Sequence, residues 1–183
     1  PVIVHTFHGN VLRGYFGGLK SRLFLWVERL LAHVTDQIVT LGELQRKEIL
    51  DMGVGTPDRV AVVPLGMELD AFMALPRRPG TLRSRLGLEA SCRLVGIVAR
   101  LVPIKGHRMF LSAARRVALS CPGVHFVVVG DGELRSELES AVVELGLSGR
   151  VHFTGWIRDL KSVYPDLDCL ALASANEGLP TAI

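Results

Sequence analysis

Short β-rich runs alternate with helical runs along almost the whole chain, and this alternation limits the fold more than any other feature of the sequence. We expect strands at residues 2–5, 37–41, 60–63, 94–99, 124–129, 151–153 and 167–171. We expect helices at residues 19–34, 43–52, 107–119, 133–145 and 159–164, and a short helix that follows Pro79 and ends at Leu86. Strands that alternate with helices form parallel sheets through right-handed crossovers, so the sequence predicts an α/β fold whose sheets are covered on both faces.

One segment breaks both periodicities and is the best candidate for a link between two domains. The stretch Leu75-Pro76-Arg77-Arg78-Pro79-Gly80 is rich in Pro and Arg and poor in apolar residues. We therefore place one domain at residues 1–75 and a second at residues 76–183. The chain opens at Pro1 without a secretion signal and stops at Ile183 without a helix stop, so we expect both domains to be incomplete parts of a longer protein.

Composition and charge exclude several classes of protein. With 49% apolar and 21% charged residues the chain is globular, and no apolar run reaches the roughly 18 residues of a membrane-spanning helix. A net charge of +3 is too small to predict nucleic-acid binding. Residues 77–116 carry ten cations and one acid, which suits an anionic ligand or membrane surface, although a solvated charged face is an equal alternative. The three cysteines are far apart and no His lies at zinc-ligand spacing, so we expect no metal and a reducing, cytoplasmic location.

Charged residues follow the first expected strand of the second domain, at the sheet edge where ligands of open α/β sheets bind. Arg100 follows the strand at 94–99, and Lys105 comes just before the helix at 107–119. A guanidinium and an ammonium at a helix N-terminus would bind a diphosphate, because the helix dipole and both side chains favour an anion there. Two surface cations in a basic region are the alternative.

Other motifs leave a functional and a structural interpretation open. The carboxylate of Glu177 would either accept hydrogen bonds from sugar hydroxyls or cap a helix. Gly130-Asp131-Gly132 lacks the third Gly and the later acid of a dinucleotide fingerprint, which favours a structural turn and disfavours an NAD dehydrogenase. His8 would transfer a proton, contact a phosphate or be structural, whereas His5 is expected to pack inward. The apolar side of the helix at 19–34 is expected to pack into the core rather than on a membrane.

Taken in order, these motifs resemble the family-four retaining glycosyltransferases of the GT-B fold over essentially the whole chain. The residues that carry the resemblance are His5-Thr6-Phe7-His8-Gly9, Thr35-Asp36-Gln37-Ile38-Val39, Val62-Val63-Pro64-Leu65-Gly66-Met67-Glu68, Val98-Ala99-Arg100-Leu101 with Lys105-Gly106, Val129-Gly130-Asp131-Gly132-Glu133-Leu134, Phe153-Thr154-Gly155, and Ser174 with Glu177-Gly178-Leu179-Pro180. The resemblance implies a GT-B architecture of two Rossmann-like parallel-sheet domains, acceptor-side at 1–75 and nucleotide-sugar-binding at 76–183. A second family Glu would fall two residues beyond Ile183, so we expect the chain to be inactive by itself.

The resemblance also implies roles for individual residues. Those expected at the donor are Arg100, Lys105, Trp156, Ile157, Glu177, Gly178 and Leu179. Arg100 and Lys105 would contact the diphosphate, Glu177 the sugar, and the backbone near Trp156 the base. Those expected on the acceptor side are His8, Gly9 and Asn10, with His8 approaching the donor sugar. The expected catalytic residues are His8, Arg100, Lys105 and Glu177.

The resemblance implies transfer of a sugar from a nucleotide-diphosphate donor, UDP- or GDP-linked, to an acceptor hydroxyl with retention of the anomeric configuration. The expected partners are this donor and a sugar, lipid-linked or other hydroxyl acceptor, without nucleic acid, a cofactor or a metal. We expect a cytoplasmic enzyme and leave open its peripheral contact with the inner face of an anionic membrane. A GT-B epimerase or phosphorylase and a non-catalytic nucleotide-binding module are the alternatives.

Overall fold

The computed structural model describes residues 1–9 and 18–175, and the chain divides into two compact units. Unit 1 runs from Pro1 to Met67, and unit 2 runs from Glu68 to Ser174. Each unit has its own parallel sheet and its own hydrophobic core. The two units are therefore described separately.

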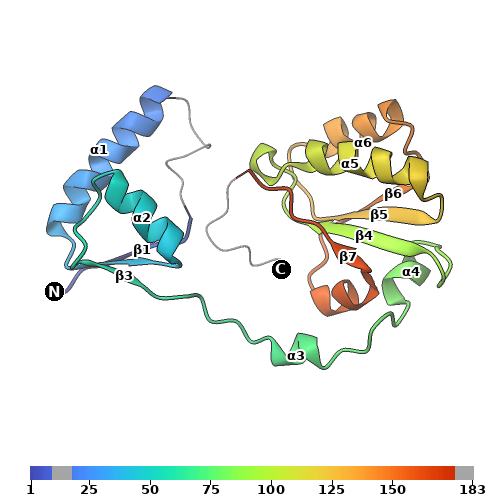
Figure 1. Ribbon diagram of the computed structural model, residues 1–183, viewed down its shortest axis with the longest axis horizontal. Coiled ribbons are helices and arrows are strands. Elements are labelled where there is room, and N and C mark those ends of the chain that lie inside the picture. Colours follow the sequence, from blue (N-terminus) through green and yellow to red (C-terminus); the bar gives the residue numbers. More distant parts are fainter. Residues whose placement is uncertain (10–17, 176–183) are drawn as a thin grey trace. The chain divides into compact units, whose positions relative to one another are not determined.

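Unit 1 is a parallel sheet in the order β1-β2-β3 with two helices on one of its faces (Figure 1). Its elements are β1 (Val4–Phe7), α1 (Gly18–Val34), β2 (Gln37–Thr40), α2 (Glu43–Asp51) and β3 (Val60–Val62). The buried core between sheet and helices consists of Phe7, Ala32, Ile38, Ile49, Val54 and Val60. Removing these apolar side chains from water holds the helices against the sheet.

Most apolar side chains of α1 are exposed, which corrects the expectation that they pack into the core. Leu19 is 85% exposed, Trp26 58% and Val34 63%. In the described part of α1, Leu25 and Ala32 join the core, because the helix turns a narrow side toward the sheet. His5, expected to pack inward, does so only in part. Its ring stacks on Phe7 with centres 4.5 Å apart, but 37% of its side chain stays exposed.

Unit 2 is a parallel sheet in the order β6-β5-β4-β7, covered on both faces. Its elements are α3 (Asp70–Met73), α4 (Thr81–Arg85), β4 (Arg93–Val98), the 3-10 turn η1 (Pro103–Lys105), α5 (His107–Ser120), β5 (Val124–Val129), α6 (Arg135–Glu144), β6 (Val151–Gly155), the 3-10 turns η2 (Leu160–Ser162) and η3 (Tyr164–Asp166), and β7 (Cys169–Leu170). Helices α5 and α6 cover one face, and α4 with the 3-10 turns η2 and η3 covers the other (Figure 1). Phe126 and Val128 of β5 point to the first face, and Val127 and Val129 to the second. The two-sided burial confirms the predicted α/β layers for this unit.

The segment between the units packs on unit 2. The ring centre of Phe72, in α3, lies 5.9 Å from that of Tyr164, and the amide of Arg78 donates to the carbonyl of Pro165 at 2.7 Å. These contacts place Phe72 and Arg78 with unit 2, which begins at Glu68, and the domain boundary expected from the sequence lies between residues 75 and 76.

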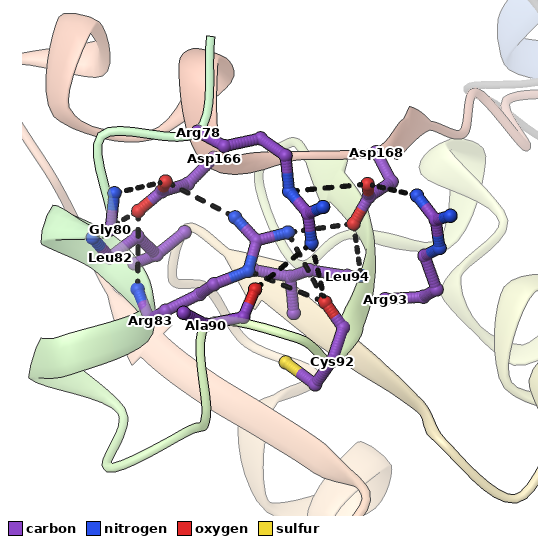
Figure 2. A network of polar contacts seen from close by, with 10 residues as sticks. All are labelled: Arg78, Gly80, Leu82, Arg83, Ala90, Cys92, Arg93, Leu94, Asp166 and Asp168. Atoms are coloured by element: carbon purple, nitrogen blue, oxygen red, sulfur yellow. Dashed lines mark hydrogen bonds and ion pairs between the residues drawn. The ribbon is translucent and has the colours of Figure 1, made fainter.

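A buried ion-pair network anchors the start of α4 to the sheet of unit 2 (Figure 2). Both carboxylate oxygens of Asp166 accept hydrogen bonds from backbone amides at the start of the helix, from Gly80 at 2.7 Å and Leu82 at 2.6 Å. The guanidinium of Arg83 bridges Asp166 at 3.1 Å and Asp168 at 2.7 Å. The side chains of Arg83 and Asp166 are 2% and 0% exposed, so the network belongs to the core.

This network corrects the interpretation of residues 77–116 as one basic surface for an anion. Arg78, Arg83 and Arg93 all pair with Asp168, which follows much later in the chain. Burial acts to raise the pKa of Asp168, but the Leu94 amide and these three guanidinium groups together hold that pKa below its usual range. Arg83 is buried in the network and is not available to a phosphate, and Arg78 and Arg93 each form an ion pair with Asp168.

Candidate functional site

The carboxyl ends of three strands of unit 2 surround a small pocket. Its volume is about 150 Å³, and its walls are Val98, Ala99, Arg100, Val129, Gly130, Trp156, Ile157 and Leu160. The lining is mostly apolar, but Trp156 is 69% exposed and the guanidinium of Arg100 makes no hydrogen bond or ion pair with a described residue. An exposed aromatic ring beside an available cation suits a flat, anionic ligand.

The pocket keeps its shape because two glycines let backbone segments touch. A Cβ atom at Gly130, whose φ is +135°, would lie 2.1 Å from the carbonyl oxygen of Ala99, and one at Gly132 would lie 2.6 Å from that of Leu101. The amide of Leu101 donates to the carbonyl of Asp131 at 3.0 Å. The contacts confirm the structural interpretation of Gly130-Asp131-Gly132 as a tight turn.

Lys105 lies at the start of α5 but does not line the pocket described above. It ends the turn η1, and the 14-residue helix α5 begins only at His107. Gly106 between them is left-handed, with φ +67°, and a Cβ atom there would lie 1.9 Å from the carbonyl oxygen of Ala173. The N-terminus of α5 therefore meets the segment that follows β7, and the first amides of α5 lie next to Lys105.

His107 is a buried polar residue beside this position that sequence reasoning missed. It is 2% exposed, and neither ring nitrogen has a hydrogen-bond partner among the described residues. Burial, and then the charge of Lys105, lower the pKa of His107, so the ring is neutral at pH 7. A signal was present in the sequence, since His107, Phe110, Leu111 and Ala114 follow the helical spacing of a buried face.

The structure brings together part of the predicted site. Arg100, Trp156 and Ile157 line one pocket of unit 2, and their contact with a donor stays a prediction. In unit 1, His8 is exposed and Gly9 is partly exposed just after β1. The predictions for Asn10, Glu177, Gly178 and Leu179 lie outside the described residues.

The part of the chain that the structure describes has neither a cluster of metal ligands nor a membrane-spanning helix. In residues 1–9 and 18–175, no three His, Cys, Asp or Glu side chains gather where they could hold a metal ion. Asp166 and Asp168 have a spacing that suits a metal, but amides and guanidinium groups occupy both carboxylates. No described helix is long and apolar enough to cross a membrane.

Comparison with protein families decides which kind of protein carries this pocket. Residues 92–183 match the family described as "Glycosyl transferases group 1", and residues 1–66 match the "Glycosyl transferase 4-like domain". The chain belongs to the group 1 glycosyl transferases. The boundary between the two matches falls in the segment that links the two units.

Relatives of this glycosyl transferase chain span several acceptor classes. A UDP-Gal:alpha-D-GlcNAc-diphosphoundecaprenol alpha-1,3-galactosyltransferase from Escherichia coli is 27% identical over 100% of the chain and 48% of its own length. A 2-deoxystreptamine N-acetyl-D-glucosaminyltransferase from Streptomyces fradiae is 39% identical over 95% of the chain and 43% of its own length. The chain therefore spans about half the length of the curated relatives it matches.

Solved structures confirm the fold of the glycosyl transferase chain. HepE of Anabaena, crystallised in complex with UDP and glucose, superposes with a TM-score of 0.84 at 24% identity, over 100% of the chain and 49% of HepE. Unit 1 and unit 2 thus have the parallel-sheet architecture of the GT-B type that the sequence analysis expected.

Proposed function

We propose that the protein transfers a sugar from a nucleotide-diphosphate donor to an acceptor hydroxyl, with retention of the anomeric configuration. The observation that carries the proposal is the pocket at the carboxyl edge of the sheet of unit 2, which Arg100 and Trp156 line together with mostly apolar residues. The base of the nucleotide would lie against Trp156 and the backbone of Ile157. The diphosphate would reach Arg100 and the N-terminus of α5, next to Lys105.

The two cations would supply most of the catalytic effect. Breaking the bond between sugar and phosphate builds negative charge on the leaving diphosphate, and Arg100 and Lys105 would stabilise that charge more strongly in the transition state than in the ground state. The described lining of the pocket contains no carboxylate that could act as a nucleophile. We therefore favour a reaction in which the acceptor hydroxyl attacks the anomeric carbon from the same face that the diphosphate leaves. The phosphate oxygens of the leaving diphosphate would assist this attack, without a metal or another cofactor.

A UDP-linked donor is favoured over a GDP-linked one. The name of the Escherichia coli relative specifies UDP-galactose, and HepE was solved with UDP and glucose. The acceptor would be a sugar, a lipid-linked sugar or another hydroxyl compound that enters from the side of His8, Gly9 and Asn10, while Glu177, Gly178 and Leu179 would hold the donor sugar.

A cytoplasmic location is part of the proposal, because none of the three cysteines forms a disulfide. Peripheral contact with an anionic membrane stays a prediction. In the described chain, the exposed apolar side chains of α1 beside Lys20 and Arg22 are its best candidate surface.

The proposal is tested with the full-length protein that contains this chain. A panel of UDP- and GDP-sugars is first screened by thermal stabilisation, and the best donor is then incubated with hydroxyl acceptors. An NMR spectrum of the product is expected to show the anomeric configuration of the donor. Conversion of the donor without any acceptor would identify an epimerase. Release of a sugar phosphate in the presence of phosphate would identify a phosphorylase, and tight nucleotide binding without turnover would identify a binding module.

A further inference from the structure

Two histidines of unit 2 meet at the amino edge of the sheet, at the opposite end of the strands from the pocket. His125 is the second residue of β5 and His152 the second of β6. The strands are parallel, with His152 opposite Val127, so both rings lie on the same face of the sheet. Nδ1 of His125 lies 3.1 Å from Nε2 of His152, and the ring centres are 5.3 Å apart.

Both rings are neutral at pH 7. Burial lowers the pKa of each, Arg150 lowers that of His125 further, and His125 lowers that of His152 further. The guanidinium of Arg150, whose charge acts on His125, donates to the carbonyl of Val124 at 3.0 Å. A neutral imidazole is the form that binds a metal ion.

The separation of the two nitrogens suits a shared metal ion. Two imidazole nitrogens that bind one ion at about 2.0–2.1 Å, with an N–metal–N angle between about 90° and 109°, lie about 2.8–3.4 Å apart. The observed 3.1 Å falls within this range. No third His, Cys, Asp or Glu of the described residues joins the pair, so water would complete the coordination. Imidazole nitrogens are poor ligands for oxygen-preferring ions such as Mg²⁺ and Ca²⁺.

We propose that His125 and His152 form a two-imidazole binding site for a divalent transition-metal ion, with Cu²⁺ bound most tightly and Ni²⁺ and Zn²⁺ less tightly. In the ion-free pair one ring donates its N–H to the other. When the ion binds, the donating ring carries its proton on its other nitrogen instead. The lone pairs of Nδ1 of His125 and Nε2 of His152 then both reach the ion. Above the pKa of the pair, no net proton is released. The site is independent of the proposed transferase reaction.

The experiment titrates the chain with CuCl2 at pH 7.5 in a non-chelating buffer, after alkylation of the three cysteines so that thiols do not bind the ion. Calorimetry is expected to show one Cu²⁺ per chain, and electron paramagnetic resonance is expected to show hyperfine coupling to two equivalent imidazole nitrogens. MgCl2 is expected to give no heat of binding.

His125→Gln and His152→Gln each remove one ligand and keep a polar side chain of similar size. Each is expected to weaken Cu²⁺ binding about ten-fold or more. His33→Gln changes an exposed histidine in unit 1 whose Nδ1 donates to the carbonyl of Arg29; it is the matched control and is expected to leave the affinity unchanged. Thermal unfolding without metal shows whether each variant is folded. If only one of the two ligand variants folds, that variant is sufficient for the test. Coupling to one nitrogen, unchanged affinity in a folded ligand variant, or no saturable binding by the wild type would overturn the proposal.

Discussion

Replacing Asp166 by Asn should destabilise unit 2 far more than its small change in size suggests. One carboxylate oxygen accepts from the Gly80 amide and Arg83 Nη1, and the other accepts from the amides of Leu82 and Arg83. An Asn side chain has a single acceptor oxygen, so its NH2 group would face two of these donors. Each buried donor left without an acceptor costs about 1–3 kcal/mol, and breaking a buried ion pair costs about 3–5 kcal/mol. The effects overlap, and we expect a loss of about 3–5 kcal/mol in the free energy of unfolding.

The assay follows urea unfolding of unit 2 by tryptophan fluorescence. The chain has two tryptophans, so Trp26→Phe makes Trp156 of unit 2 the reporter. For an m-value of about 1–3 kcal/mol/M, the urea midpoint should fall by about 1 M or more. Arg93→Gln is the matched control, because it breaks the Arg93–Asp168 pair (3.0 Å) at a side chain that is 66% exposed and should cost at most about 1 kcal/mol. Equal midpoints for Asp166→Asn and Arg93→Gln would refute the argument that burial makes the network strong.

Three further outcomes are expected. Gly130→Ala should lower the free energy of unfolding by about 3 kcal/mol or more in the same urea assay, because its Cβ would lie 2.1 Å from a carbonyl oxygen. The control Gly146→Ala, whose Cβ would have nothing within 4 Å, should lower it by only about 1–2 kcal/mol. Similar losses in the two variants would contradict the close approach at Gly130. Burial lowers the pKa of three histidines of unit 2 (His107, His125, His152), so below pH 6.5 the unfolded chain binds more protons than the folded chain. The urea midpoint should therefore be constant above pH 6.5 and fall as the pH is lowered from 6.5 to 5. A midpoint that increases as the pH is lowered would contradict this. Lys105→Ala should reduce kcat of the full-length protein about 10²-fold, while EDTA should leave the wild-type rate unchanged; a full rate in Lys105→Ala would exclude its proposed role.

The layers of the fold could be predicted because they depend on patterns of single residues. The alternation of strand and helix periodicity located the sheet of unit 2, and the residues after its strands located the pocket with Arg100 and Trp156. The helix expected at 107–119 agrees closely with α5, which spans His107–Ser120, but the helix expected at 159–164 was wrong, because the two 3-10 turns η2 and η3 stand there instead. The Gly130-Asp131-Gly132 turn was predictable from the missing parts of the dinucleotide fingerprint.

Features that depend on pairing across the chain could not be predicted in this way. Arg83 and Asp166 lie far apart in the sequence, and a local count of charge treats Arg83 as one more surface cation. The meeting of His125 with His152 depends on the register of β5 and β6, which a sequence pattern does not specify. The apolar positions of α1 predicted an amphipathic helix but not which of them would face the sheet of unit 1.

The affinity of the chain for UDP tests the central claim, that the pocket at the carboxyl edge of unit 2 holds the nucleotide of the donor. Isothermal titration calorimetry compares the wild type with Arg100→Ala and with Arg116→Ala, which removes an exposed cation from α5 away from the pocket lining. Losing a charge-assisted hydrogen bond should weaken binding about ten-fold or more in Arg100→Ala, and Arg116→Ala should bind like the wild type. Equal affinity in Arg100→Ala and the wild type, or no binding of UDP by the wild type, would contradict the account.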